Sequence, residues 1–345
     1  MEREEEYEFG QVVKLDRGFP LVKFSDGSEA RCEHATNLVK NDANRCVIGD
    51  NVWVARSGEH DMGIVVSIAP RSRELLRKDP AQRAVPQVLA ANFDRVIIAQ
   101  PIIEVNMKRL ERELVLAHQT GADVSIVLTK ADLAEGSSVL DEAVSAVREL
   151  AGNVGVFVVS ERDEESVKAV RALMPKGTMT VLMGRSGVGK SSLINLLVGE
   201  RILKTSSVRE RDGKGRHTTV SREIVELPDG GLVVDMPGVR GLGVWEAEEG
   251  IQTAFSDVEE FAQNCRFRDC THRNEPGCAV RKAVKMGVLS QDRLDSYLGL
   301  TFEVNEMRNR REQARRASGT KASDEKAGKA HGRRRGRGKR PSSRG

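Results

Sequence analysis

The chain has no run of apolar residues that approaches the roughly 20 needed for a membrane-spanning helix. Its N-terminus starts with a mostly acidic stretch, Met1–Glu6, and lacks the apolar centre of a secretory signal peptide. Aromatic residues are also scarce, at 4% of the 345 residues, although 39% of the chain is hydrophobic, which is enough to form cores. These absences exclude a membrane-spanning chain and predict a cytoplasmic protein without a membrane partner.

Cysteine is rare as well, with five residues in the chain. Cys32 and Cys46 lie far apart near the N-terminus. In a reducing cytoplasm we expect them to be ordinary half-buried residues.

The other three cysteines lie close together in a pattern typical of a metal site. Cys265, Cys270, His272 and Cys278 follow the spacing C-x4-C-x-H-x5-C. Tetrahedral zinc takes four thiolate or imidazole ligands, and a Cys3His set leaves no open position for a substrate. The spacing therefore predicts one structural zinc ion, which would supply much of the folding energy of a segment poor in apolar residues.

The net charge of +4 conceals an asymmetry along the chain. From residue 308 to the end, Lys and Arg outnumber Asp and Glu by 15 to 3, whereas the preceding residues carry 40 basic and 48 acidic side chains. An acidic body with a basic tail favours a polyanionic partner that the tail reaches. We expect the residues from 245 to 316 to form a helical zinc-binding domain, with helices at 279–286 and 290–316. Residues 317–345 have low complexity and predict a disordered basic tail that binds RNA phosphates.

The length favours two or three domains. We expect the first, residues 1–72, to be a small β-barrel. Its expected strands are Gly10–Leu15, Phe19–Phe24, Glu29–Cys32, Asn51–Ala55 and Gly63–Ile68. About five short strands fit a barrel of the oligonucleotide-binding (OB) type, but an SH3-like barrel and a purely structural role stay open. Residues 73–91 are expected to be a linker. The basic segment Arg71–Lys78 could contact a phosphate backbone or could simply be solvated.

An α/β domain is expected over residues 92–244. Continuous apolar runs predict strands buried on both faces of a parallel sheet, at 95–99, 123–128, 155–159, 179–183 and 232–235. Amphipathic patterns predict helices between them, at 107–119, 138–150 and 164–173.

One strand of this domain leads directly into a G-x4-G-K-S phosphate loop, whose glycines allow successive N–H groups to converge on phosphate oxygens. The loop consists of Gly184, Arg185, Ser186, Gly187, Val188, Gly189, Lys190 and Ser191, and Ser192 follows it. Lys190 would reach the β- and γ-phosphates, and Ser191 would offer its hydroxyl to Mg²⁺. The pattern therefore predicts a site for a nucleoside triphosphate.

A second motif indicates which base is bound. Thr129-Lys130-Ala131-Asp132 ends a hydrophobic strand. The carboxylate of Asp132 can accept both N1–H and the exocyclic amine of guanine, whereas adenine would leave it unpaired. Ser160 ends the next strand and is expected to give a backbone contact to the base.

Two further segments predict the elements that sense the γ-phosphate. The polar segment 205–220 contains Gly215–Thr219, and Thr218 or Thr219 would complete the Mg²⁺ shell. The strand at 232–235 ends in a D-x-x-G motif. Asp235 would hold Mg²⁺ through water, and the amide of Gly238 would meet the γ-phosphate.

The motif order is inverted relative to ordinary GTPases, because Thr129–Asp132 precedes the phosphate loop, so the chain is circularly permuted. This order, with a β-barrel before it and the Cys/His cluster after it, resembles the ribosome-small-subunit-dependent GTPase family (RsgA, also called YjeQ) over nearly the whole chain. The resemblance implies a GTPase that uses GTP/GDP and Mg²⁺, is activated by the small ribosomal subunit and its rRNA, and acts in late subunit maturation. We expect a monomer.

The residue that orients the attacking water in many GTPases is replaced in this chain. Val239 stands where many GTPases carry a water-orienting glutamine, so intrinsic hydrolysis is expected to be slow. His217 is the best internal candidate for orienting water, and Arg216 could stabilise developing charge; a structural or RNA-contacting role for His217 stays open. Lys190, Thr218 and Thr219 complete the catalytic set.

Two alternatives remain beside a docked GTPase. One is an assembly module that uses nucleotide mainly to hold its shape, and the other is an ATP-dependent enzyme, against which Asp132 argues. Because the D-x-x-G motif leads into the C-terminal domain, we further hypothesise that γ-phosphate binding moves residues 250–310 as a unit.

Overall fold

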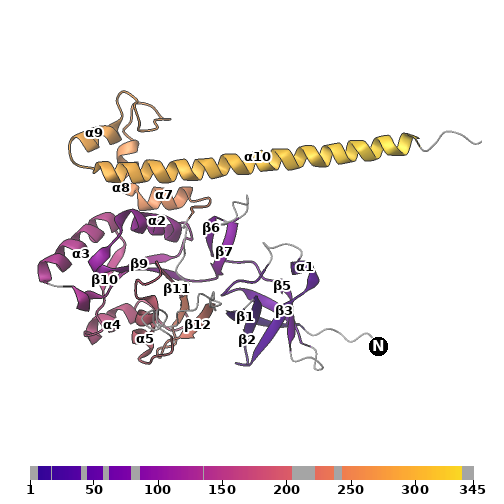
Figure 1. Cartoon of the computed structure of the whole chain (residues 1–345), viewed down its shortest axis with the longest axis horizontal. Coiled ribbons are helices and arrows are strands. Elements are labelled where there is room, and N and C mark those ends of the chain that lie inside the picture. The colour runs from indigo at the N-terminus through magenta and orange to yellow at the C-terminus, as the bar shows by residue number, and fades with distance from the viewer. Residues whose placement is uncertain are drawn as a thin grey trace, which may run out of the picture.

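The computed structural model describes residues 7–16, 18–39, 45–56, 62–78, 86–134, 136–203, 222–236 and 243–335. Figure 1 shows three parts: a β-barrel, a central sheet flanked by helices, and a C-terminal group of helices with one long helix. The predicted fold class is therefore confirmed. Within the described residues, no helix has both the length and the apolar character that crossing a membrane would demand.

The N-terminal part is a closed five-stranded barrel. Its elements are β1 (Tyr7–Asp16), β2 (Phe19–Phe24), β3 (Glu29–His34), α1 (Thr36–Val39), β4 (Asn51–Ala55) and β5 (Gly63–Ile68). The strands follow the order β1-β2-β3-β5-β4, β3 and β5 run parallel, and β4 pairs with β1 to close the ring. This order is that of an OB-type barrel, which settles the choice that the strand count left open.

Cys32 and Cys46 point into the barrel core, where they are 0% and 6% exposed. They are thus buried rather than half-buried as predicted. Burial raises the pKa of Cys32 to about 11 and that of Cys46 to about 12, so both remain neutral thiols that pack as small apolar groups.

The central part is a sheet covered on both faces. Its strands are β8 (Arg95–Pro101), β9 (Asp123–Thr129), β10 (Gly155–Val158), β11 (Met179–Met183), β12 (Arg222–Glu226) and β13 (Leu232–Asp235). They lie in the order β10-β9-β8-β11-β13-β12, and all neighbours are parallel except β12 and β13. The connecting elements are η2 (Ile102–Glu104), α2 (Met107–His118), η3 (Ala131–Leu133), α3 (Ser137–Ala151), α4 (Glu164–Arg171) and α5 (Lys190–Val198).

Successive strand residues alternate between the two faces of this sheet. Ile98 and Ile126 pack in one apolar cluster with α2 and α3, whereas Ile97 and Val127 pack in another with α4 and α5. The continuous apolar runs are explained by this double coverage.

The predicted linker contains regular structure. β6 (Glu74–Lys78) and β7 (Pro86–Ala91) form an antiparallel two-stranded sheet. Leu75 and Leu89 are almost fully buried in the core of the central part, which explains why these residues are ordered rather than solvated. Before β6, Arg71 makes a bidentate ion pair with the fully buried Asp50 at the end of the barrel, at 2.7 and 2.9 Å.

A strand pair also joins the barrel to the central sheet. β1 pairs antiparallel with β12, with Lys14 opposite Glu223 and Leu15 opposite Arg222. The Nζ of Lys14 lies 2.7 Å from a carboxylate oxygen of Glu223. The two parts therefore form one continuous 11-stranded sheet.

The C-terminal part consists of α7 (Glu248–Ala254), α8 (Ser256–Ala262), α9 (Ala279–Lys285) and α10 (Gln291–Arg335). In Figure 1 α10 crosses above α7 and α2 and projects beyond the body. The helix extends past the predicted boundary at residue 316 and enters the segment predicted to be disordered. The added residues contain no proline and several Ala, Lys, Glu and Arg, which favour helix.

Candidate nucleotide and metal sites

The phosphate loop lies between the buried strand β11 and helix α5, as predicted. Gly184, Gly187 and Gly189 all have positive φ, at 145°, 87° and 98°. A Cβ at Gly184 would lie 2.6 Å from the carbonyl oxygen of Ala99, so only glycine fits where the loop begins beside β8. The loop thus has the turn that brings backbone N–H groups and the N-terminus of α5 to one point.

Lys190 is buried and folded back onto the loop. Its Nζ donates to the carbonyl oxygens of Gly184 and Arg185 at 2.9 and 3.2 Å. A phosphate bound in the loop would accept the same protons. The ammonium group is therefore already held at the position that phosphate recognition requires.

The base-reading segment lies against the phosphate loop despite the inverted order of the two motifs. Thr129 Oγ1 donates to the carbonyl oxygen of Val188 at 2.5 Å, and Lys130 Nζ donates to that of Gly187 at 2.7 Å. Lys130 itself has a left-handed backbone conformation, with φ of 62°. These contacts join the two predicted motifs into one site.

Among the described residues, one oxygen of the Asp132 carboxylate, Oδ1, is buried without a hydrogen-bond donor. A buried acceptor without a donor costs free energy, and the two N–H donors on one edge of guanine would satisfy it. The geometry at Asp132 therefore fits the predicted choice of base.

Ser160 was predicted to give a second, backbone contact to the base. The backbone N–H of Ser160 already donates to Ser166 Oγ at 3.2 Å, and Ser160 Oγ accepts from the Arg162 amide at 3.1 Å. In the described part of the chain, the amide between them, of Glu161, makes no hydrogen bond. The backbone contact from Ser160 to the base therefore stays a prediction, with the Glu161 amide as the neighbouring unused donor.

Two predicted magnesium-site residues meet at the end of the sheet. Asp235 ends β13, next to β11, and Ser191 opens α5. Ser191 Oγ donates to Asp235 Oδ2 at 3.3 Å. A hydroxyl beside a carboxylate supplies the oxygen ligands that Mg²⁺ prefers, so this pair fits the predicted ion.

Several other predicted residues lie outside the described residues. They are Arg216, His217, Thr218 and Thr219 of the 215–219 segment, with Gly238 and Val239 after Asp235.

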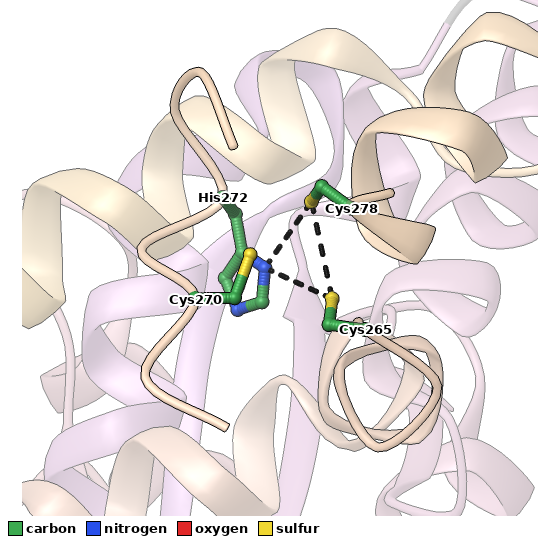
Figure 2. Close-up of side chains that lie close together, drawn as sticks. All are labelled: Cys265, Cys270, His272 and Cys278. Atoms are coloured by element: carbon green, nitrogen blue, oxygen red, sulfur yellow. Dashed lines mark hydrogen bonds between the residues drawn. The ribbon is translucent and has the colours of Figure 1, made fainter. Parts of the chain in front are cut away.

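The Cys/His cluster assembles as predicted. The ligand atoms of Cys265, Cys270, His272 and Cys278 all lie within 4.8 Å of one another. The Sγ atoms of Cys265 and Cys278 are 3.9 Å apart, and they lie 3.6 and 3.5 Å from Nδ1 of His272. Figure 2 shows these groups facing one another, with Cys270 beside the imidazole ring. Two thiolates bound to tetrahedral zinc at about 2.3 Å would be about 3.8 Å apart, so the arrangement fits a closed metal site.

Residues around the cluster hold it in shape. Glu275 accepts hydrogen bonds from the Thr271, Arg273 and Asn274 amides, and the bond from the Thr271 hydroxyl is foremost in lowering the pKa of Glu275 to about 2. The backbone N–H of Ala279, at the start of α9, donates to Cys265 Sγ at 3.3 Å. Sequence reasoning missed Glu275, although its position between two ligands was a signal.

Comparison with known proteins agrees with this geometry. The family model of the RsgA GTPase matches residues 68–245. A protein from Streptomyces avermitilis named small ribosomal subunit biogenesis GTPase RsgA is 41% identical over 296 residues, which cover 85% of this chain and 79% of the relative. A protein of the same name from Methanosarcina acetivorans is 40% identical over 260 residues, covering 75% of this chain and 70% of the relative.

Two solved structures share the fold. The crystal structure of YjeQ from Thermotoga maritima is 24% identical with a TM-score of 0.62, covering 87% of this chain and 99% of that one. The structure of YloQ, described as a circularly permuted GTPase, is 24% identical with a TM-score of 0.59, covering 90% of this chain and 98% of that one. The likeness confirms the permuted three-part architecture.

Proposed function

This chain belongs to the RsgA GTPase family and is a GTP hydrolase, and we propose that it hydrolyses GTP when docked on the small ribosomal subunit, during the late maturation of that subunit. The observation that carries the proposal is the contact between Thr129–Lys130 and the phosphate loop. This contact supports the proposal that Thr129–Asp132 reads guanine while the adjacent loop binds the phosphates.

Within this site the base is read by Asp132, through its orphaned oxygen, and by the amide that follows Ser160. The phosphates lie along residues 184–192, with Lys190 on the β- and γ-phosphates. Ser191 and Asp235 hold Mg²⁺, which offsets the charge of the phosphates. The residues present fit GTP and GDP better than adenine nucleotides.

Hydrolysis needs a group that orients water, and Val239 cannot supply one. We assign this role to His217; Thr218 or Thr219 would complete the Mg²⁺ shell, and the Gly238 amide would meet the γ-phosphate. In the free protein this set works slowly. Docking on the subunit holds His217 in working geometry and thereby starts turnover.

The Cys3His cluster holds one structural zinc ion. Three thiolates and a buried imidazole are soft and borderline ligands of the kind zinc takes, and the closed set argues against catalysis. Because the cluster lies between α8 and α9, the bound ion would hold these two C-terminal helices together.

The protein works as a cytoplasmic monomer whose partner is the small subunit and its rRNA. The excess of basic residues after 308 supports this proposal, since it favours contact with a polyanion.

The deciding experiment measures GTP turnover by the purified protein with and without small ribosomal subunits. Large subunits and ATP serve as controls. Strong stimulation by small subunits alone is expected. Tight GTP binding without any stimulation would instead favour a nucleotide-dependent assembly module with little physiological catalysis.

A further inference from the structure

Helix α2 carries a fully buried carboxylate that the nucleotide site does not use directly. The side chain of Glu113 is 0% exposed. Its Oε2 accepts from Gln100 Nε2 at 2.5 Å, and its Oε1 accepts from Arg109 Nε at 2.9 Å. Both oxygens accept hydrogen bonds, and the cation of Arg109 at one of them favours the ionised form.

This carboxylate lies directly behind the phosphate loop. Gln100 is at the carboxyl end of β8, next to Ala99, which the loop approaches at Gly184. The carbonyl oxygen of Gln100 also accepts from Thr129 Oγ1 at 3.3 Å, and the same hydroxyl bonds the loop at Val188. The single proton of this hydroxyl makes the short bond to Val188, and the longer contact places Gln100, and with it Glu113, beside the loop.

Glu113 also interacts with the loop through its charge. Burial raises the pKa of Glu113, while the nearby Arg109, the bond from Gln100 and the ammonium of Lys190 act to lower it. Because Gln100 and Thr129 connect Glu113 to the loop, the carboxylate is near enough to reduce the positive potential felt by a phosphate bound there. Low local dielectric makes this interaction stronger than it would be in water.

We propose that Glu113 limits the affinity of the site for GTP and GDP, and so speeds the release of GDP after hydrolysis. Affinity changes within one site are carried mostly by the dissociation rate. A carboxylate behind the loop therefore lets GDP leave the site sooner, so that GTP can replace it. The inference rests on guanine-nucleotide binding in this site, and it is independent of docking on the subunit.

The test measures binding and release of a fluorescent N-methylanthraniloyl derivative of GDP by the full-length protein with Mg²⁺ at pH 8. Glu113→Gln keeps the shape and removes the charge. We expect it to tighten binding roughly three- to tenfold, mainly through slower release. If Glu113 only supported the loop, the same change would weaken binding, so the sign of the effect separates the two roles.

A matched control lies on the same helix. Glu111 is 3% exposed and pairs with Arg293 of α10 rather than facing the loop, so Glu111→Gln should leave the affinity unchanged. Glu113→Met also removes the charge and fills the buried position with an apolar side chain; it should tighten binding in the same direction, which decides the question if Glu113→Gln does not fold.

Unchanged or weaker binding by folded Glu113→Gln would overturn the proposal, as would unchanged or weaker binding by folded Glu113→Met. Failure of the unmodified protein to bind the GDP derivative is a different result. It would remove the nucleotide assignment on which the inference rests.

Discussion

At the scale of single residues, Asp132 decides which base is bound. Asp132→Asn replaces an acceptor by a donor at one oxygen position, which suits the extra carbonyl of xanthine and opposes the amine of guanine. We expect GTP affinity to fall at least about a hundredfold and xanthosine triphosphate to become the better ligand. Competition binding with both nucleotides checks this. Asp123→Asn, at the exposed start of β9, the strand that precedes Asp132, should leave the preference for GTP unchanged.

His217 carries the second prediction at this scale. His217→Ala is expected to lower turnover with saturating small subunits by about 10²–10³-fold, because a positioned general base typically contributes that much. GTP affinity should not change, since the base and phosphates are held by other residues. Undiminished turnover would assign catalysis to Arg216 or to the ribosomal partner.

At the scale of elements, sequence patterns predicted the strands and turns that depend on neighbouring residues in the chain. The five apolar strands and the glycine loop follow from strand patterns and backbone freedom, and their presence is confirmed. Burial on both faces was wrong for β10, which lies at the edge of the sheet and is only partly buried. The β6–β7 pair was missed because the adjacent Leu75 and Leu76 break the alternation expected of a strand. Pairing of β1 with β12 could not be predicted either, since partners such as Lys14 and Glu223 are 209 positions apart.

The joint between the barrel and β6 depends on one buried ion pair. Asp50 accepts from Arg71 and also from the Val47 amide at 2.7 Å. Asp50→Ala leaves the guanidinium of Arg71 without this partner, and we expect a loss of about 3 kcal/mol in the free energy of unfolding. Urea denaturation measures it. Glu8→Ala, which breaks an exposed pair with Arg56, should cost less than about 1 kcal/mol.

The metal cluster is the second element whose stability can be tested. Cys265→Ser removes one of four ligands, and we expect loss of the single bound zinc with a lower melting temperature. Metal analysis and circular dichroism measure the two effects. The matched change Cys32→Ser alters a thiol buried in the barrel and should keep one zinc per chain. Retention of zinc by Cys265→Ser would contradict the Cys3His assignment.

At the scale of the whole molecule, the three parts share one apolar core. A single cluster includes Ile48 beside the barrel, Leu75 of the β6–β7 pair, Ile98 of the sheet and Phe255 and Leu300 of the C-terminal part. The barrel also has a core of its own, whereas the sheet face that carries α2 and the C-terminal helices share one interior. The hypothesis that γ-phosphate binding moves residues 250–310 as a unit stays a prediction, and such a movement would have to separate buried surfaces on α2.

Arg293 of α10 makes polar contacts that join the C-terminal part to α2 of the central part. Its guanidinium lies 2.8 Å from Glu111 of α2 and 2.9 Å from Asp257 of α8, and it stacks on Phe255 at 4.1 Å. Because Glu111 is buried, Arg293→Met leaves a carboxylate without its cation, which typically costs about 3–5 kcal/mol.

We therefore expect unmodified protein to unfold its central and C-terminal parts in one calorimetric transition, and Arg293→Met to separate them into two. The exposed Arg310, on the same helix, makes only a distant pair with Glu306 at 3.9 Å, so Arg310→Met should keep the single transition. Two transitions in the unmodified protein would mean that the shared core does not couple the parts. The C-terminal helices would then be free to move with the switch, as the order of the motifs along the chain first indicated.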